Sequence, residues 1–156
     1  MRLGAAEWGY KAFFSGLASN KAGVAIFFNN NFTFKVLRQI CDKEGGYIID
    51  LEVDELILTI YNIYAPNKDD PIFFQNVREQ MIMFRWEEII LGGDFNLVLD
   101  VTKDKKGGKL TMRRNSLKVI QNIRDNLDLT DIWRDLNPEG RRYTWRQNKP
   151  EIHCRL

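Results

Sequence analysis

Hydrophobic and polar residues alternate along most of the first 64 residues, which is the pattern of β-strands with one face towards a core. The segments with this pattern are rich in β-branched and aromatic residues, and they are residues 10–16, 23–29, 32–41, 47–53 and 56–64. Between them lie turn-forming residues at 19–21, 29–31 and 43–46. The first part of the chain therefore predicts antiparallel hairpins.

After Pro66 the hydrophobic residues recur every three or four positions, which is the period of an amphipathic helix. Helices are predicted at residues 71–85, where Asp70-Pro71 is a helix start, from Asn115 onward behind a polar cap, and as a short turn at 129–136. Short strands are predicted at 88–91 and 143–145. Hairpins followed by helices and strands indicate a mixed sheet packed with helices.

Composition is that of a globular chain with room for one substantial core, since 44% of the 156 residues are hydrophobic. The net charge of +2 predicts no partner. No segment has the length and hydrophobicity of a spanning helix or a signal peptide, so no membrane is expected. The distant cysteines Cys41 and Cys154 favour reduced thiols in an intracellular protein, with a disulfide as the alternative.

Residues 91–96 read Leu-Gly-Gly-Asp-Phe-Asn and follow the predicted strand 88–91, which places a carboxylate and an amide in a tight turn. On an extended segment Asp94 and Asn96 face the same way and reach one ligand. A carboxylate orients or deprotonates a water, and an amide donates to a phosphate oxygen. A glycine turn with Asp94 as a helix cap is the structural alternative.

Tyr64 lies at the end of another predicted strand, in the segment 62–67. If this strand shares a sheet with residues 88–91, Tyr64 and Asp94 emerge close together and the phenol reaches a phosphate oxygen. The alternative is a strand-end aromatic residue with its hydroxyl in water.

These motifs together resemble the endonuclease/exonuclease/phosphatase superfamily, which has the DNase I-like fold. A closer resemblance, to the endonuclease domain of non-LTR (LINE-type) retrotransposons, comes from residues 8–10, 19–26, 62–67 and 143–145. The resemblance extends over essentially the whole chain. It implies a four-layer α/β sandwich of two mixed sheets flanked by helices. Residues 1–156 are then a single partial domain, a fragment truncated at both ends.

Roles for individual residues follow from the resemblance. It implies that Asp94 orients or deprotonates the attacking water, that Asn96 contacts the scissile phosphate or that water, and that Tyr64 binds a phosphate oxygen. It also implies that Thr144 lies near the DNA phosphate, although a strand residue at a polar sheet edge is as good an interpretation. Trp145 and Arg155 fall beside other positions of the family.

The family uses Mg²⁺, and the resemblance therefore implies this cofactor. The metal-binding glutamate of the family, its early asparagine and its closing Asp-His pair have no counterpart here, so no metal ligand is assigned. The single histidine, His153, does not occupy the catalytic position of the family and is interpreted as an ordinary strand or loop residue. Activity of these residues by themselves is not expected.

A basic run extends over residues 101–118 and carries a charge of +6, with Asp104 as its single acid. Clustered cations attract a phosphate backbone without reading bases, and a solvated loop is the alternative. The expected nucleic-acid contacts in this run are Lys103, Lys105, Lys106, Lys109, Arg113 and Arg114, and Lys118 is its last cation.

The predicted function is a Mg²⁺-dependent DNA endonuclease that nicks a strand by phosphodiester hydrolysis. The alternatives are a non-catalytic remnant that binds nucleic acid at most, and a phosphoesterase of the same superfamily that acts on a small molecule or lipid. The expected partners are DNA and, in the full-length element, a reverse transcriptase domain. The intact element is expected to work in the nucleus.

Overall fold

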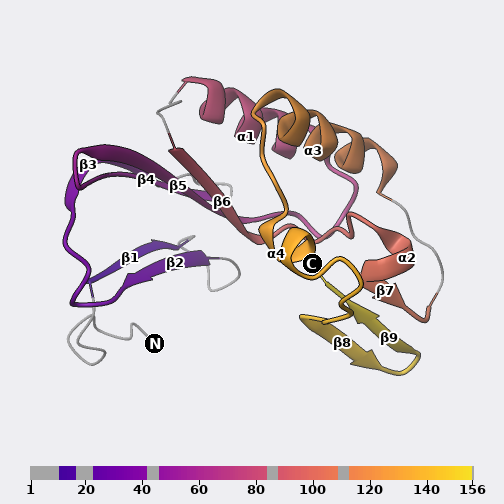
Figure 1. The fold of residues 1–156 in the computed structure, drawn as a ribbon. Helices are drawn as coiled ribbons and strands as arrows, with labels where there is room; N and C mark the ends of the chain where they lie inside the picture. Colours follow the sequence, from indigo (N-terminus) through magenta and orange to yellow (C-terminus); the bar gives the residue numbers. More distant parts are fainter. Residues whose placement is uncertain (1–10, 17–22, 42–45, 84–87, 109–112, 156) are drawn as a thin grey trace. The chain divides into compact units, whose positions relative to one another are not determined.

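The computed structural model describes residues 11–16, 23–41, 46–83, 88–108 and 113–155 (Figure 1). The chain divides into two compact units. The first consists of Met1–Ala65 and Met83–Asp94, and the second of Pro66–Ile82 and Phe95–Leu156. Strands make up the first unit, and the second combines helices with a small sheet. The predicted mixed α/β character is confirmed.

Two sheets build the first unit. Strands β1 (Lys11–Gly16) and β2 (Gly23–Phe28) pair as a two-stranded sheet. A second sheet has the order β3-β4-β5-β6, formed by β3 (Lys35–Cys41), β4 (Gly46–Val53), β5 (Leu56–Tyr64) and β6 (Glu88–Asp94). Pairing is antiparallel from β3 to β5 and parallel between β5 and β6. All five strands predicted before residue 65 are therefore present, and their bounds differ from the expected ones by at most three residues.

The predicted turn at residues 29–31 is present, because the amide of Phe32 donates to the carbonyl of Asn29 at 2.9 Å. The predicted turn at 19–21 and residues 43–45 of the third turn lie outside the described residues, as do Trp8-Gly9-Tyr10. A tight β4–β5 connection contains Asp54 and Glu55, both with positive φ.

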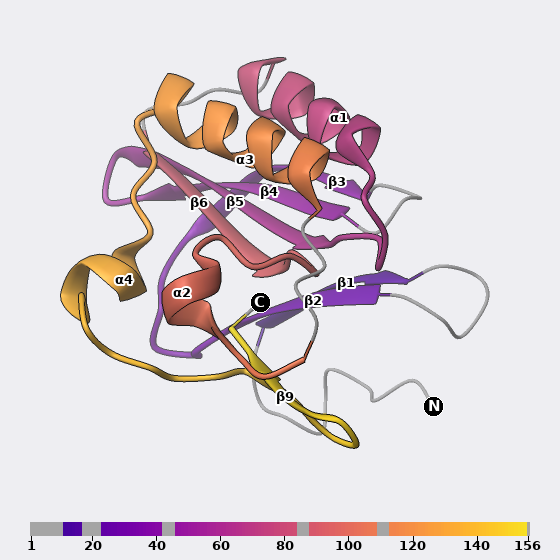
Figure 2. The same cartoon turned by 90° about the vertical axis from the view of Figure 1, so that its right-hand side faces the viewer.

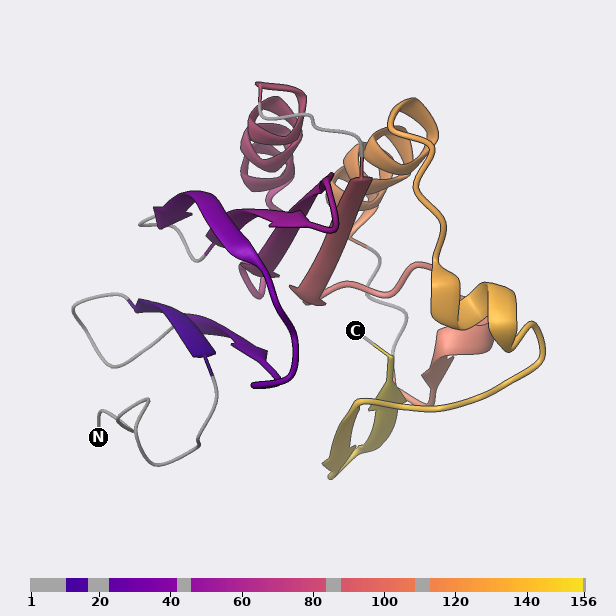
Figure 3. The same ribbon diagram turned by 60° about the vertical axis from the view of Figure 1, so that its left-hand side comes forward.

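The core of the first unit lies between the β1–β2 sheet and one face of the four-stranded sheet, which Figure 3 shows from the side. Phe28, Ile49 and Leu51 are its buried centre. Alternate residues of a strand face one side, so the same pattern that predicted the strands selects these residues. The half-buried hydrophobic residues packed around them are Phe13, Val24, Ile26, Phe32, Phe34, Val53 and Ile60.

A polar row crosses the other face of the sheet. Asp50 on β4 is 1% exposed and lies in register with Arg38 on β3 and Thr59 on β5. The Nε of Arg38 donates to Asp50 at 2.7 Å, and the Thr59 hydroxyl donates to the other carboxylate oxygen at 2.9 Å. The buried carboxylate is thereby compensated by a charge and a hydroxyl.

Strand β6 is longer than the sequence predicts. The expected strand ended at Leu91 and the glycines formed a turn, but pairing with β5 continues through Gly92 and Gly93 to Asp94. Gly93 has φ +128°, and a Cβ there would lie 2.0 Å from the carbonyl oxygen of Ile63. Glycine at this position therefore extends the strand by allowing a close backbone approach, where the sequence suggested a turn.

The second unit contains two long helices, α1 (Pro71–Met83) and α3 (Arg114–Asn126). Asp70 caps α1 by accepting from the amide of Phe73, as the sequence predicts. The N-terminal ends of these helices lie together, because the amide of Asp70 donates to the Ser116 hydroxyl at 2.9 Å (Figure 2). Phe84 and Arg85, the expected last residues of α1, lie outside the described residues. None of the described helices is long and apolar enough to span a membrane.

Short elements complete this unit: α2 (Val101–Asp104), β7 (Lys105–Lys106), α4 (Ile132–Leu136), β8 (Trp145–Asn148) and β9 (Glu151–Cys154). The strands form an antiparallel sheet in the order β7-β9-β8. The strand predicted at 143–145 begins at Trp145, and the amide of Thr144 bonds to the carbonyl of Cys154 just before it. The helical turn predicted at 129–136 begins at Ile132.

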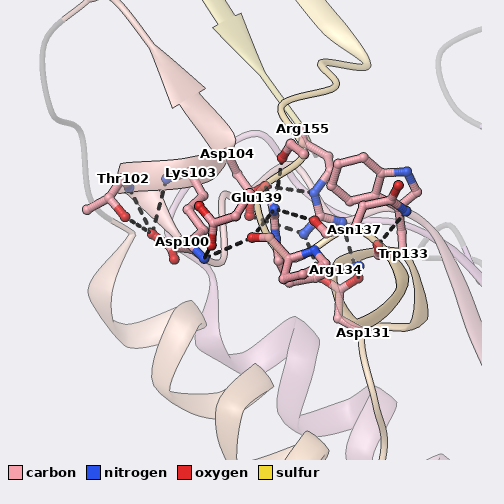
Figure 4. A network of polar contacts seen from close by, with 12 residues as sticks. Asp100, Thr102, Lys103, Asp104, Asp131, Trp133, Arg134, Asn137, Glu139 and Arg155 are labelled. Carbon is pink, nitrogen blue, oxygen red and sulfur yellow. Dashed lines mark hydrogen bonds and ion pairs between the residues drawn. The ribbon is translucent and has the colours of Figure 1, made fainter.

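A buried ion network joins α2, α4 and the end of β9 (Figure 4). Asp104 is 2% exposed, and both of its carboxylate oxygens accept from Arg155, at 2.8 and 3.1 Å. Arg134 pairs with the same carboxylate. The main chain adds a bond from the amide of Arg155 to the carbonyl of Asp104 at 2.9 Å. The Asp104 carboxylate, on the last residue of α2, thus pairs with two guanidinium groups directly before the basic strand β7.

Asp131 and Trp133 complete the network. Asp131 accepts from Arg155 and from the amide of Arg134, which caps α4. Both guanidinium groups lie against the Trp133 ring, 4.8 and 5.0 Å from its centroid. Burial raises the pKa of Asp131, but the hydrogen bonds and charges of Arg155 and Arg134 outweigh burial and leave this pKa below its usual value. Hydrogen bonds from Arg155 to Asp104 raise the pKa of the arginine.

Replacing Gly93 tests the close approach of β5 and β6. We expect Gly93→Ala to lower the free energy of unfolding by about 2 kcal/mol or more, because the new Cβ would meet the Ile63 carbonyl. Gly92→Ala is the matched control, since a Cβ at Gly92 would meet no atom within 4 Å. Urea denaturation followed by circular dichroism measures both variants, and equal stability of the two would contradict the explanation.

Replacing Asp104 tests the ion network. We expect Asp104→Ala to cost about 3–5 kcal/mol of stability, because two partly buried guanidinium groups lose their shared carboxylate. Asp125→Ala removes an exposed pair with Arg124 on α3 and is expected to change stability by less than about 1 kcal/mol. Urea titration of both variants checks this, and a small loss for Asp104→Ala would show that the network is not structural.

Candidate functional site

Tyr64 and Asp94 lie side by side at the carboxyl ends of two parallel strands. They are the last residues of β5 and β6 and are partners in the register of the sheet. The amide of Ala65 donates to the Asp94 carbonyl at 2.8 Å, which extends the pairing one step past the strand ends. Paired residues of neighbouring strands project from the same face of a sheet. Strands β5 and β6 therefore share one sheet, which was the condition for Tyr64 and Asp94 to lie close together.

The two side chains differ in exposure. Tyr64 is 39% exposed, whereas Asp94 is half-buried. The carboxyl ends of parallel strands are where open α/β sheets place their ligand-binding groups. A phenol and a carboxylate at this edge can offer a hydrogen-bond donor and a proton acceptor to one ligand.

Asn96 lies beyond the strand, in the second unit, where its φ is +49°. The expectation that Asp94 and Asn96 lie on one extended segment is therefore wrong. The strand pairing ends at Asp94, and asparagine adopts the left-handed backbone region more readily than most residues. The carbonyl of Asn96 accepts a hydrogen bond from Arg113.

The guanidinium of Arg113 bonds to three acceptors in two loops. Its Nη1 donates to the carbonyls of Asn96 and Pro66, the latter at 3.5 Å, and its Nη2 donates to the Asn67 side chain. Arg113 is half-buried and occupies the N-cap position of α3 without giving it a side-chain cap. The loop that follows β5 and the loop that follows β6 are thus joined by one side chain.

Asp69 supplies the cap of α3 from a distant part of the chain. Its carboxylate accepts from the amide and hydroxyl of Ser116, at 2.8 and 2.7 Å, and from Asn115. The bonds from the Ser116 amide and hydroxyl hold the pKa of Asp69 below its usual value. The predicted polar cap of this helix is therefore present, but it comes from the loop after β5 and not from the residues that directly precede the helix.

The basic run is only partly available to a ligand. Lys103 donates to the Pro138 carbonyl at 2.9 Å and pairs with Glu139 at 3.2 Å, and Arg113 bonds to the loops. Lys106 on β7 and Arg114 at the start of α3 are exposed. Lys105 is half-buried, the exposed Thr144 precedes β8, and Lys109 lies outside the described residues.

His153 lies within β9, half-buried, with the Tyr143 ring 5.4 Å away and Glu151 at 3.6 Å. Its prediction as an ordinary strand residue agrees with this position. Cys41 and Cys154 are both free thiols, as expected.

Sequence reasoning missed the structural use of Asp104, Arg113 and Arg155. For Asp104 the sequence does contain a signal, because a single acidic residue within the basic run indicates a specific structural role. The pairing itself links residues 51 positions apart, which a pattern along the chain does not reveal.

The donor set for a metal ion is small. In the part of the chain that the structure describes, no three His, Cys, Asp or Glu side chains gather as a possible metal site. Mg²⁺ prefers an octahedron of oxygen ligands with one or two carboxylates, and Asp94 is a single carboxylate beside a phenol. The described residues do not by themselves form a magnesium site.

Comparisons with known proteins agree with the sequence motifs, although no family model matches the chain. Over 144 residues it is 31% identical to the Xenopus laevis "Transposon TX1 uncharacterized 149 kDa protein", with 89% of this chain and 11% of that protein covered. The structure resembles an AP endonuclease from Archaeoglobus fulgidus with a TM-score of 0.65 and 18% identity, over 91% of this chain and 60% of that one.

The chain thus spans about a tenth of the transposon protein and 60% of the AP endonuclease. The sequence identity shows common ancestry with a transposon protein, and the structural likeness shows the fold. The chain is therefore homologous to a segment of a transposon protein, and it has the fold of an AP endonuclease.

Proposed function

We propose that this chain is part of a DNA endonuclease of a non-LTR retrotransposon that nicks one strand by Mg²⁺-dependent phosphodiester hydrolysis. The observation that carries the proposal is the pairing of Tyr64 with Asp94 at the carboxyl ends of β5 and β6. Homology to a transposon protein and the likeness to an AP endonuclease support the same function.

Each proposed role suits the chemistry of its residue. The Asp94 carboxylate orients the attacking water and accepts its proton, which generates the nucleophile. The Tyr64 phenol donates a hydrogen bond to a phosphate oxygen on which negative charge develops. The Asn96 amide, two residues after Asp94, contacts the scissile phosphate or the water. Magnesium is part of the proposal, but none of these roles is routed through it.

DNA is the proposed substrate because the exposed cations are spread along the chain. Lys106 and Arg114 are exposed and lie eight positions apart in the sequence, with Thr144 exposed beside β8. A polyanionic backbone offers a phosphate to each such cation, whereas a small phosphate ester engages few of them. Lys103 and Lys105 belong to the same run and contribute to its field.

A second candidate is a domain that binds nucleic acid without cleaving it. The described residues lack a metal-type cluster, which is the observation in its favour. Binding through Lys106 and Arg114 needs no metal ion. Nicking assays separate the two candidates.

The rest of the element is also a proposal. Since the chain spans a tenth of the transposon protein, a reverse transcriptase domain in the same polypeptide is an expected partner. A nick that leaves a 3′-hydroxyl would provide the primer for that enzyme. Both would then work in the nucleus, where the target DNA is.

The decisive experiment measures nicking of a supercoiled plasmid with MgCl₂ or with EDTA. We expect Mg²⁺-dependent nicking by a longer segment of the same element, and we expect Asp94→Asn to lower it at least about 100-fold, because the general base is lost. Asp54→Asn is the matched control, since this exposed turn residue has a positive φ that asparagine also adopts. The assay is made on this chain and on a longer segment of the same element.

Other results would redirect the assignment. Nicking that survives Asp94→Asn would remove Asp94 from the mechanism. Salt-dependent DNA binding by both chains without any nicking would favour the non-catalytic candidate. Hydrolysis of small phosphate esters without DNA cleavage would favour a phosphoesterase.

Salt dependence of DNA binding tests the cationic contacts separately. We expect Lys106→Ala to reduce the slope of log K against log salt by about 0.9, because one phosphate contact is lost. Lys35→Ala on β3 is the control, since this lysine is also exposed and pairs with Glu52 outside the basic run. Fluorescence anisotropy with a labelled duplex measures the slopes, and equal slopes would remove Lys106 from the interface.

A further inference from the structure

Arg113 belongs to the basic run by sequence, but its hydrogen bonds differ from those of a surface cation. Both terminal nitrogens donate to acceptors of the chain itself, to the carbonyls of Asn96 and Pro66 and to the Asn67 side chain. The side chain is half-buried, whereas the next residue, Arg114, is exposed. Neighbouring arginines therefore have different surroundings.

The acceptors of Arg113 lie at informative positions along the chain. Pro66 is two residues after Tyr64, and Asn96 is two residues after Asp94. Each of these loops continues directly from a strand that ends in a proposed catalytic residue. Arg113 thus bonds to both of the backbone segments that leave the candidate site.

Arg113 is itself held at the start of α3. Ser116 and Asn115, in the first turn of that helix, bond to Asp69, and Ser116 also accepts from the amide of Asp70. The loop 66–70 is therefore attached to α3 at both of its ends. Because the start of α3 is held in this way, the Arg113 guanidinium has a defined position, and its forked donors reach two carbonyls at once.

We propose that Arg113 is a positioning residue, which fixes the loops after β5 and β6 so that Asn96 has the geometry required for hydrolysis. The inference rests on the proposed function, and it gives Arg113 a different role from the phosphate contact expected of the basic run. Displacements of about 1 Å in a catalytic group cost on the order of 100-fold in rate. A lysine cannot replace the fork, because one ammonium does not span the same acceptors in one plane.

The test compares Arg113→Ala and Arg113→Lys with Arg114→Ala and Arg124→Ala. In plasmid nicking by the longer segment of the element, we expect both Arg113 variants to lower kcat about 100-fold with KM within about 2-fold. Their salt slope for DNA binding stays that of the wild type. Arg114→Ala lowers that slope by about 0.9. Arg124, exposed near the end of α3 and paired with Asp125, is the control whose replacement changes neither quantity.

Chemical rescue distinguishes positioning from a general loss of structure. Millimolar guanidinium chloride restores part of the kcat of Arg113→Ala by occupying the vacated site, whereas NaCl at the same ionic strength does not. Rescue by the free ion is not expected for Arg113→Lys, where the ammonium occupies the space.

Hydrogen exchange provides a readout that needs no activity. We expect Arg113→Ala and Arg113→Lys to speed exchange at least about 10-fold at the amides of 67–70 and 95–97, with exchange in β4 unchanged. If the wild type does not nick DNA, the proposed function fails, and exchange alone decides whether Arg113 holds the loops. Unchanged exchange, or a salt slope reduced by about 0.9 in the Arg113 variants, would overturn the inference.

Discussion

The close parallel approach of β5 and β6 is the constraint on which the candidate site depends. Gly93 lies so near the Ile63 carbonyl that any side chain would push the strands apart. Because the strands remain paired past this point, Asp94 comes into register with Tyr64, 30 positions earlier in the chain. The glycine pair that looks like a turn is thus a closely paired stretch of strand, and Tyr64 and Asp94 lie at strand ends, which are more rigid than a loop.

Positive charge has two uses in this chain. Arg134 and Arg155 compensate the buried Asp104, and Arg113 bonds to backbone carbonyls, so these arginines organise the second unit. Lys106 and Arg114 remain exposed. Arginine suits the first use, because its planar fork satisfies several acceptors in one geometry, and lysine suits the second as a hydrated point charge. A count of cations along the sequence therefore overstates the surface available to a nucleic acid.

The fold and the function stand on different kinds of support. The likeness to an AP endonuclease at 18% identity gives the architecture, and an architecture hosts many chemistries. The case for hydrolysis comes from what Tyr64 and Asp94 can do at adjacent strand ends. The described residues contain no metal-type cluster, so common descent with a transposon protein is not by itself an argument for catalysis.

The sequence by itself determined the strands of the first unit, the two long helices and the lineage, because these depend on local periodicity and on motifs that are contiguous in the chain. It also identified Tyr64 and Asp94 as partners, on the condition of a shared sheet. Only the tertiary structure decided that β6 extends to Asp94 and that Asn96 lies outside the extended segment, with a positive φ. It also decided that Arg113 bonds to backbone carbonyls and that Asp104 is buried. These outcomes depend on contacts between residues far apart in sequence, such as Gly93 with Ile63 and Arg155 with Asp104, and local patterns do not encode such contacts.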